Sequence, residues 1–263
     1  RDLRMSRGLG DVYKRQKRFC PPEEPACWEG VYKADHFGCV CPQIEHEPDS
    51  FYGKEFYLDP EFGMKQSEDC LYLNIWTPAN TVDEKLPVAF WIHGGAFMHG
   101  FSHESEFDGS AYCERGVILV TINYRLGAFG FLAHPWLSEE SGVGRSGNYA
   151  ILDQIAALKW VKENIAAFGG NPENITVFGQ SAGCMSVQTL VSSPLTENWI
   201  SKAIFQSAGG YDTGLNRDMP LSEAETIGQE FVELSGAKSL EELRAIPVSY
   251  THLRAHETCA DLV

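Results

Sequence analysis

Residues 179–183 read Gly179-Gln180-Ser181-Ala182-Gly183, and they lie between an apolar run at 175–178 and a stretch with helical spacing at 182–191. A serine on a sharp turn from a strand into a helix is typical of a nucleophile elbow, which holds the serine Oγ clear of its own backbone. The flanking glycines fit this prediction, because a Cβ at either position would collide with the neighbouring strand and helix. Since the five-residue pattern occurs by chance in roughly one of ten chains this long, its meaning depends on the rest of the sequence.

A second informative segment, Trp91-Ile92-His93-Gly94-Gly95-Ala96-Phe97, directly follows the apolar run 86–90. Small residues after a strand leave backbone N–H groups uncovered and able to point into a cleft, which is what an oxyanion hole requires. The two segments together predict a serine nucleophile with an oxyanion hole. The alternative is a glycine-rich turn and a buried serine that take part in no chemistry.

The composition excludes several classes of protein. The 263 residues, 43% hydrophobic and 22% charged, suffice for one sizeable core. A net charge of −15 argues against nucleic-acid and anionic-membrane partners, which require basic patches. No apolar stretch approaches the ~18 residues of a membrane span. The basic N-terminal residues lack the apolar segment of a signal peptide, so we expect a cytoplasmic location and a natural N-terminus outside this sequence.

The eight cysteines are too few for a disulfide scaffold in a chain of this length. Cys39-Val40-Cys41 has the spacing C-x-C rather than C-x-x-C, and no pair of histidines follows it at a ligand spacing. We therefore predict no metal site and no cofactor, and mostly reduced or buried thiols.

Apolar, β-branched runs predict strands, several of them apolar on both faces of the pleat, as in strands that lie between two helical layers. A helical pattern fills 149–168 and ends at Gly169-Gly170-Asn171-Pro172. The order of strands and helices around the elbow indicates an α/β fold with a largely parallel sheet. We expect strands at 71–76, 86–92, 117–124, 175–178 and 203–205, further helices at 222–234 and 239–245, and a long loop at 42–69.

Beyond these two segments, a series of motifs resembles the type-B carboxylesterase, or cholinesterase-like, family of α/β-hydrolases. The motifs run in the family's order over roughly residues 18–210, so the joint match is far more specific than any single motif. The resemblance implies an α/β-hydrolase fold, a mostly parallel sheet flanked by helices, that is incomplete at both ends of this chain. The further motifs are Trp28-Glu29-Gly30-Val31, Phe37-Gly38, Cys41-Pro42-Gln43, Ser67-Glu68-Asp69-Cys70-Leu71-Tyr72-Leu73-Asn74, Asn123-Tyr124-Arg125-Leu126-Gly127, Gly147-Asn148-Tyr149, Asp153-Gln154 and Phe168-Gly169-Gly170.

The resemblance implies hydrolysis of a small-molecule carboxylic ester through an acyl-enzyme, with Ser181 as the nucleophile. In this family the acid and the histidine of the triad follow the serine, and the histidines that follow Ser181 are His252 and His256. Both lie in a tail that does not match the family, so we expect the chain to lack the triad acid and histidine. The backbone N–H groups implied for the oxyanion hole are those of Gly95, Ala96 and Ala182.

The resemblance bears on three residues in these segments. His93 precedes the serine, so its expected role is to hold the loop by hydrogen bonding rather than to act as the base. Gln180 stands where many relatives carry a glutamate, which weakens any argument for cationic substrates. Ala96 stands where many relatives carry a third glycine, but a backbone donor does not depend on that side chain.

The segment between Cys41 and Cys70 matches a loop that a disulfide closes in secreted relatives, so the resemblance implies a possible Cys41–Cys70 disulfide. In a cytosolic protein the pair is expected to be reduced. The loop contains no tryptophan, the residue that cholinesterases use to stack a quaternary ammonium, which argues against a choline-ester specialist.

Two alternatives stay open. A cholinesterase-like binding module without catalysis keeps the fold but lacks the serine, so the intact elbow speaks against it. An inert fragment is the second alternative, because the missing parts are catalytic. The sequence gives no indication of the oligomeric state.

Both ends of the chain differ from the middle. Residues 1–18 hold seven of the 21 lysines and arginines, and 6–16 and 247–258 resemble translated adapter sequence. The alternative is a basic disordered arm and a short polar tail. The expected organisation is an arm at 1–17, a partial α/β-hydrolase domain at 18–246 and a non-native tail at 247–263.

Overall fold

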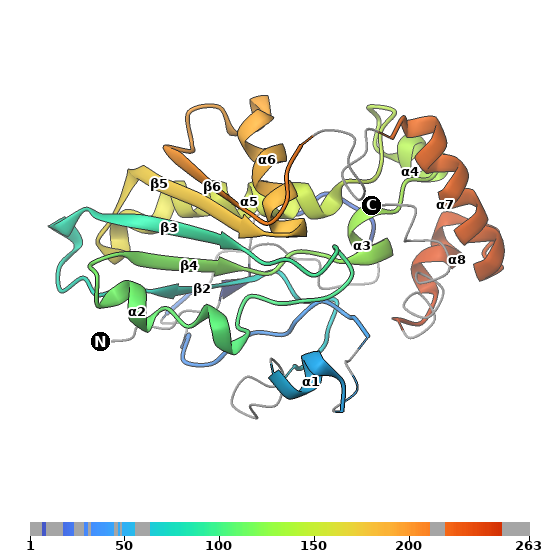
Figure 1. Cartoon of the computed structure of the whole chain (residues 1–263). Coiled ribbons are helices and arrows are strands. Elements are labelled where there is room, and N and C mark those ends of the chain that lie inside the picture. The colour runs from blue at the N-terminus through green and yellow to red at the C-terminus, as the bar shows by residue number, and fades with distance from the viewer. Residues whose placement is uncertain are drawn as a thin grey trace.

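The computed structural model describes residues 7–8, 18–23, 29–30, 33–44, 47, 49–55, 64–210 and 219–248 (Figure 1). The strands are β1 Arg7–Gly8, β2 Tyr72–Trp76, β3 Leu86–Ile92, β4 Ile118–Ile122, β5 Gly170–Gln180 and β6 Lys202–Gln206. The helices are α1 Phe51–Glu55, α2 Ser110–Cys113, α3 Gly127–Phe131, α4 Pro135–Glu140, α5 Tyr149–Asn164, α6 Ala182–Ser192, α7 Leu221–Ser235 and α8 Leu240–Ala245. Short 3₁₀ helices are η3 Val82–Glu84, η4 Ser105–Phe107, η5 Ile165–Phe168 and η6 Pro194–Thr196.

The strands form one sheet in the order β1-β2-β4-β3-β5-β6. β4, β3, β5 and β6 are mutually parallel, whereas β2 is antiparallel to β4 and β1 is antiparallel to β2. The predicted α/β fold with a mostly parallel sheet is therefore confirmed. Because parallel strands end at the same edge of a sheet, the segments that follow β3, β4 and β5 meet there.

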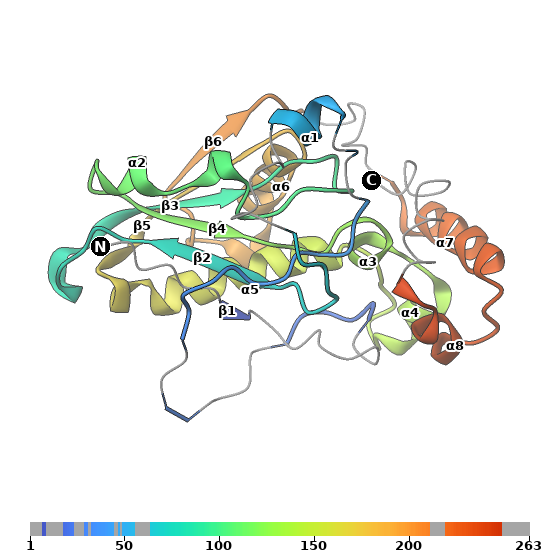
Figure 2. The ribbon, with the colours of Figure 1, turned by 90° about the horizontal axis from the view of Figure 1, so that it is seen from below.

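The strand residues alternate between two apolar layers. Val88, Phe90 and Ile92 of β3 point into a large core that includes residues of α5 and α6. Ala89 and Trp91 point the other way, into a smaller cluster against α2. The ribbon shows the same layers, with α5 and α6 on one face of the sheet and α2 on the opposite face (Figure 2). Burial on both faces explains why these strands read as continuous apolar runs.

The longer helices follow the sequence pattern. α5 and η5 together fill the predicted segment 149–168 and end at Gly169, which has a φ of 78°. α6, α7 and α8 lie within one or two residues of their predicted bounds, and Ser239 caps α8 by accepting a hydrogen bond from the N–H of Glu242. Periodicity combined with a cap or a glycine stop was thus sufficient for these elements.

The helices α1 to α4 were not predicted. α3 reads Gly-Ala-Phe-Gly-Phe and is buried on every side, so it has no polar face from which a period could be recognised. α4 begins at Pro135, with His134 as its N-cap. The prediction of a loop throughout 42–69 was incomplete, because α1 lies within it.

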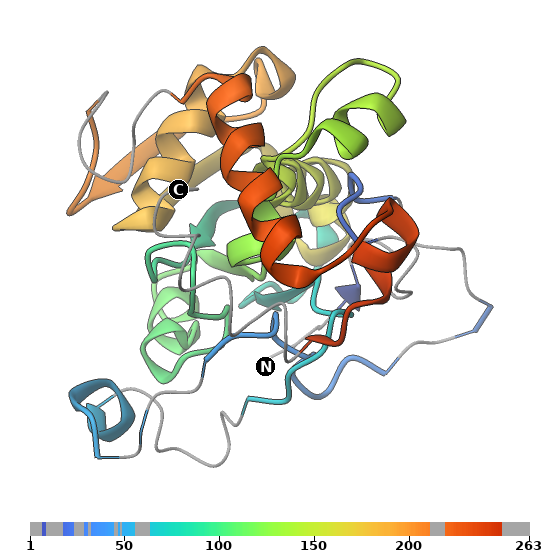
Figure 3. The ribbon, with the colours of Figure 1, turned by 90° about the vertical axis from the view of Figure 1, so that its right-hand side faces the viewer.

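A cluster of helices covers one end of the sheet. α4, α7 and α8 lie together there (Figure 3). Ser138 of α4 donates a hydrogen bond to Glu225 of α7, and Arg244 of α8 forms an ion pair with Glu140 of α4. At the opposite edge of the sheet from β1, β6 is exposed along most of its length, and Ile204 and Phe205 are each 48% exposed.

The N-terminal arm has one described feature. Arg7 and Gly8 form β1, opposite Leu73 and Tyr72 of β2. The other residues of the arm and most of the tail, including His252 and His256, lie outside the described residues. The proposed division into arm, domain and tail therefore stays a prediction.

Buried charges join distant parts of the chain. Arg125 and Asp153 form an ion pair of 2.6 Å with side-chain exposures of 3% and 0%. The Arg125 guanidinium also donates to the carbonyl of Cys20 at 2.7 Å. Arg18, which is 1% exposed, pairs with Glu68 and donates to the carbonyl of Ile246 at 2.7 Å. These contacts attach the segments at 18–20 and 246 to the body of the fold.

We expect removal of one partner of the Arg125–Asp153 pair to be strongly destabilising, because the other charge would remain buried and unpaired. Asp153→Asn should lower the free energy of unfolding by about 3–5 kcal/mol. Replacing both residues with apolar ones, as in Arg125→Met/Asp153→Leu, should cost much less. Urea unfolding followed by circular dichroism measures both.

The control is Lys159→Ala, which breaks an exposed ion pair with Glu163 on α5. Its effect should be within about 0.5 kcal/mol. Equal urea midpoints for Asp153→Asn and Lys159→Ala would contradict the prediction that the buried pair matters more to stability than the exposed one.

Candidate active site

Ser181 lies at the junction of β5 and α6, where the backbone turns sharply. Its φ of 55° and ψ of −123° are outside the regions that residues with a Cβ normally occupy. A Cβ on Gly179 would lie 2.5 Å from the carbonyl oxygen of Gly183, and a Cβ on Gly183 would lie 2.1 Å from that of Ile92. Both flanking glycines are therefore required by close backbone contacts, as the sequence pattern predicted.

Hydrogen bonds hold the strained turn from both sides. The N–H of Ser181 donates to the carbonyl of Gln206 at the end of β6, at 2.9 Å, and the Ser181 carbonyl accepts from Met185 at 3.1 Å. The serine side chain is half-buried and does not cap its own helix. Its Oγ is therefore not engaged as a structural N-cap, although serine is a favoured residue at that position.

The segment after β3 lies directly against this turn. A Cβ on Gly94 would lie 2.7 Å from the carbonyl oxygen of Gln180 and 3.3 Å from the Cβ of Ser181. Gly95, Ala96 and Phe97 all have positive φ values, of 100°, 52° and 59°. The structure thus brings the two segments singled out in the sequence, residues 91–97 and 179–183, into contact.

The predicted oxyanion donors are three backbone N–H groups, those of Gly95, Ala96 and Ala182. In the described part of the chain, the N–H groups of Gly95 and Ala96 make no hydrogen bond to another backbone group. Ala182 is the first residue of α6, so its N–H has no acceptor within the helix. The Gly95 carbonyl, in contrast, accepts from Met98 and His99, which closes the turn.

Buried polar side chains fix the remainder of this loop. The Gln43 amide donates to the carbonyl of Gly100 at 3.1 Å and accepts from its N–H at 2.7 Å. Asn123 accepts from the N–H of Ser102 at 2.8 Å, and Asn74 donates to the Ser102 hydroxyl at 2.9 Å. The motifs that contain these residues were recognised in the sequence, but their roles were missed. Asparagine or glutamine residues next to apolar segments were the sequence feature that could have indicated buried side-chain hydrogen bonds to the loop.

His93 is a support of the loop in this geometry. It is 1% exposed, and its Nδ1 lies 2.8 Å from the carbonyl oxygen of Gly94, so Nδ1 carries the proton of the neutral ring. Burial lowers the pKa of His93 to about 3, against a smaller raising effect of the Gly94 hydrogen bond. Such a weakly basic ring is unsuited to take the proton of a serine at neutral pH.

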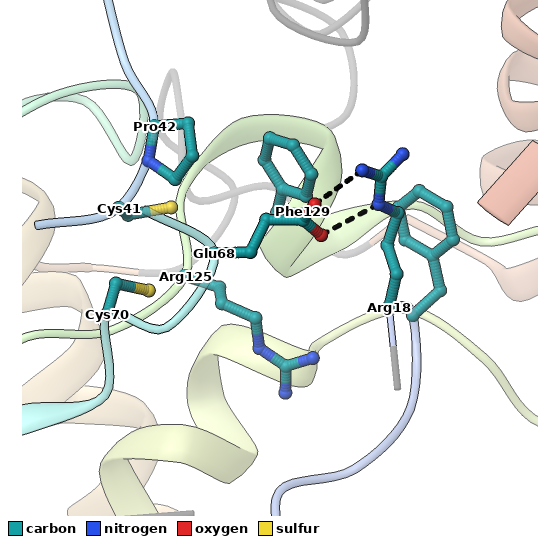
Figure 4. Close-up of a pocket in the computed structure, with 8 residues that line it drawn as sticks. Arg18, Cys41, Pro42, Glu68, Cys70, Arg125 and Phe129 are labelled. Atoms are coloured by element: carbon teal, nitrogen blue, oxygen red, sulfur yellow. Dashed lines mark hydrogen bonds and ion pairs between the residues drawn. The ribbon is translucent and has the colours of Figure 1, made fainter. Parts of the chain in front are cut away.

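Cys41 and Cys70 lie side by side at a small cavity (Figure 4). Both are buried free thiols in this structure, and a hydrogen bond to Cys41 together with burial raises the pKa of Cys70. The cavity holds about 10 Å³, roughly one water, and Arg18, Glu68 and Arg125 line it. Ser181 is not among the residues that line it. A Cys41–Cys70 disulfide stays a prediction.

Two kinds of feature are absent from the described ranges. No group of three histidine, cysteine or acidic side chains gathers there in a way that could hold a metal ion. None of the helices described combines the length and hydrophobicity of a bilayer span.

Comparison with known proteins identifies relatives of this arrangement. A profile of the carboxylesterase family matches residues 14–248. The chain is 44% identical over 214 residues to the fumonisin B1 esterase of Sphingopyxis macrogoltabida. The aligned region is 81% of this chain and 37% of that esterase. The chain is also 44% identical over 222 residues to the para-nitrobenzyl esterase of Bacillus subtilis (strain 168), covering 84% of this chain and 42% of that one.

Solved structures agree with this assignment. The carboxylesterase EST55 of Geobacillus stearothermophilus superposes on 97% of this chain with a TM-score of 0.80 and 38% identity, and a PNB esterase does so with a TM-score of 0.77 and 36% identity. The chain spans about half of each of these structures, 49%. By the family profile, the close sequence relatives and the shared α/β-hydrolase fold, this chain belongs to the carboxylesterase family.

Proposed function

We propose that this chain carries the nucleophile and the oxyanion hole of a serine carboxylic-ester hydrolase. The observation that carries the proposal is the contact between the two strained segments. Ser181 stands on its turn against Gly94, and Gly94 leads into the loop whose Gly95 and Ala96 N–H groups bond to no backbone group in the described part of the chain. A nucleophile and unpaired backbone donors in one place are the two parts that acyl transfer needs.

The proposed reaction passes through an acyl-enzyme. The Ser181 Oγ attacks the ester carbonyl while a histidine takes its proton, and the carbonyl oxygen becomes an oxyanion. The N–H groups of Gly95, Ala96 and Ala182 donate to that oxyanion, each donor contributing about 10²–10³ in kcat. The alcohol then leaves with the proton from the histidine. Water then attacks the acyl-serine while the histidine takes a proton from it. The serine oxygen leaves with that proton, and the carboxylic acid is released.

The histidine and its acid partner are proposed to come from sequence that this chain does not contain. The family order places them after the serine, and the matched region is only 37% and 42% of the two relatives. His93 is excluded as the base by its Gly94 hydrogen bond and its low pKa of about 3.

The proposed substrate is a small-molecule carboxylic ester. The named esters of the two relatives differ, a fumonisin and a nitrobenzyl ester, so the family does not fix the alcohol or the acyl group. Gln180 adds no negative charge beside Ser181, and its exposed side chain gives no preference for a cationic substrate. A binding module without catalysis is the competing function, and the strained serine turn favours catalysis over it.

The first prediction concerns the nucleophile. In a complete enzyme that contains this chain, Ser181→Ala should reduce turnover of a short-chain nitrophenyl ester by about 10⁴-fold or more. Labelling by a fluorophosphonate probe should disappear as well, because the probe bonds to the serine oxygen. The control is Ser192→Ala, which removes an exposed hydroxyl from the other end of α6 and should change neither signal. Normal labelling of Ser181→Ala would refute the assignment, and no labelling of the parent would favour the binding module.

The second prediction concerns the oxyanion donor at Ala96. Proline is a poor test there, because the φ of 52° is incompatible with its ring. Replacing Ala96 with lactic acid by nonsense suppression exchanges the N–H for an ester oxygen and keeps the methyl group. We expect kcat to fall by about 10²-fold or more with KM changed only slightly.

The matched control is Ala96→Gly, which keeps the N–H and removes the strain of a Cβ at positive φ. It should stay within about threefold of the parent. Equal, small losses of kcat for both replacements would exclude Ala96 as a donor.

The third prediction concerns the chain by itself. Without a histidine base a serine hydroxyl is a poor nucleophile at neutral pH, so residues 1–263 alone should show no multiple turnover of a short-chain ester. Purified chain and its Ser181→Ala variant should give equal rates in a nitrophenyl ester assay. Robust turnover that depends on Ser181 would show that the base lies within this sequence.

A further inference from the structure

Tyr124 lies two residues after β4 and reaches the end of the neighbouring strand β3. Its hydroxyl donates to the carbonyl of His93 at 2.8 Å and lies 3.5 Å from the carbonyl oxygen of Gly94. Its ring stacks on the His93 ring, with 4.3 Å between centroids and 15° between planes. The tyrosine is 0% exposed, so no solvent competes for these contacts.

These contacts fix the direction of two consecutive peptide groups. In a trans peptide the C=O and the N–H point to opposite sides, so holding a carbonyl also aims the N–H that follows it. Tyr124 holds the His93 carbonyl, and the His93 ring holds the Gly94 carbonyl at 2.8 Å. The second of these peptides carries the N–H of Gly95. Gly94 and Gly95 lack a Cβ, so their own side chains do not limit their backbone angles, and contacts from neighbouring groups must hold them.

The His93 carbonyl also lies close to the turn that carries Ser181. The His93 carbonyl that Tyr124 holds faces Gly183, where a Cβ would lie 2.7 Å from its oxygen. Gly100 closes the other side, since a Cβ there would lie 2.6 Å from His93 Nδ1. The His93 ring therefore lies between the Tyr124 ring and Gly100, and it cannot turn freely.

Tyr124 is a permanent donor at this site. Burial raises the pKa of the phenol above its ordinary value, and the nearby Glu104 and Cys41 raise it further. The hydroxyl is therefore protonated throughout the working range of a hydrolase. A buried hydroxyl needs an acceptor, and the His93 carbonyl supplies it.

We propose that Tyr124 is a positioning residue of the oxyanion hole, which acts through His93 and Gly94 to aim the N–H of Gly95 at the substrate carbonyl. This inference rests on the proposed function. A purely structural hydroxyl would alter stability alone. A positioning hydroxyl alters the transition state, so its loss lowers kcat while KM is kept.

The test is Tyr124→Phe in the complete enzyme, with a short-chain nitrophenyl ester as substrate. The ring and its stacking remain and only the hydroxyl is lost. We expect kcat to fall by about 10-fold or more with KM within twofold, and a boronic acid that mimics the tetrahedral intermediate to bind weaker by the same factor. The control is Tyr149→Phe, which removes the hydroxyl of another buried tyrosine that stacks against Arg125 and should leave kcat unchanged.

A second pair of variants keeps the test decisive if Tyr124→Phe does not fold. His93→Asn places an amide donor near the position of Nδ1, whereas His93→Leu has no donor. The asparagine variant should retain at least 10-fold more of kcat than the leucine variant. Equal kcat values for the pair, or a parental kcat in folded Tyr124→Phe, would overturn the proposal.

Failure of the inference is distinguishable from failure of the proposed function. If Ser181→Ala is inactive while Tyr124→Phe has the parental kcat and boronate affinity, the positioning role alone is wrong. If Ser181→Ala keeps the parental activity, the proposed function is wrong and the inference fails with it.

Discussion

Three backbone segments approach one another closely at one edge of the sheet, and this contact holds the candidate site together. The end of β3, the end of β5 and the first turn of α6 are so near that Gly94, Gly179 and Gly183 have no room for a Cβ. This contact exists because β3 and β5 are neighbouring parallel strands that end together, with Ile92 opposite Gly179. Every feature of the candidate site follows from it, since it places a serine turn beside a loop with unpaired donors.

Such an arrangement is strained and must be held by its surroundings. Ser181, Ala96 and Phe97 have positive φ values, each costing about 1–2 kcal/mol. The compensation comes from hydrogen bonds of buried polar side chains to the loop backbone, among them Gln43 to Gly100 and Asn123 to Ser102. Because each such group would cost free energy if it were left unpaired, the network favours one conformation of the loop over others. The site is therefore preorganised by its supports and not by the residues that would meet the substrate.

Buried ion pairs extend this support to the remainder of the fold. Arg125 follows Tyr124 directly, and its pair with Asp153 of α5 links the segment after β4 to the helix layer. The charge of Asp153 keeps Arg125 ionised although burial opposes it, and the pKa of Arg125 is raised as a result. One short stretch, 123–125, thus positions the loop, the His93 ring and the α5 helix.

Elements that depend on local residue order could be predicted from the sequence, and so could the strained turn at Ser181. Runs of apolar residues predicted β2, β3, β4, β6 and the second half of β5, and helical spacing with caps and glycine stops predicted α5 to α8. The elbow pattern predicted the two glycines that the turn at Ser181 requires. These properties are local, because periodicity and steric demand are properties of neighbouring residues. The helix α3 was not predicted, because all of its residues are buried and its sequence therefore shows no alternation of polar and apolar faces.

Hydrogen bonds between residues far apart in the sequence are set by the folded arrangement of the strands. Gln43 meets Gly100, Asn74 meets Ser102, and Tyr124 meets His93 through hydrogen bonds between residues 28 to 57 positions apart. The antiparallel pairing of β2 with β4 is likewise a choice among neighbours in space. A linear pattern does not specify these partners, because their hydrogen bonds form only after the sheet has brought the strand ends together.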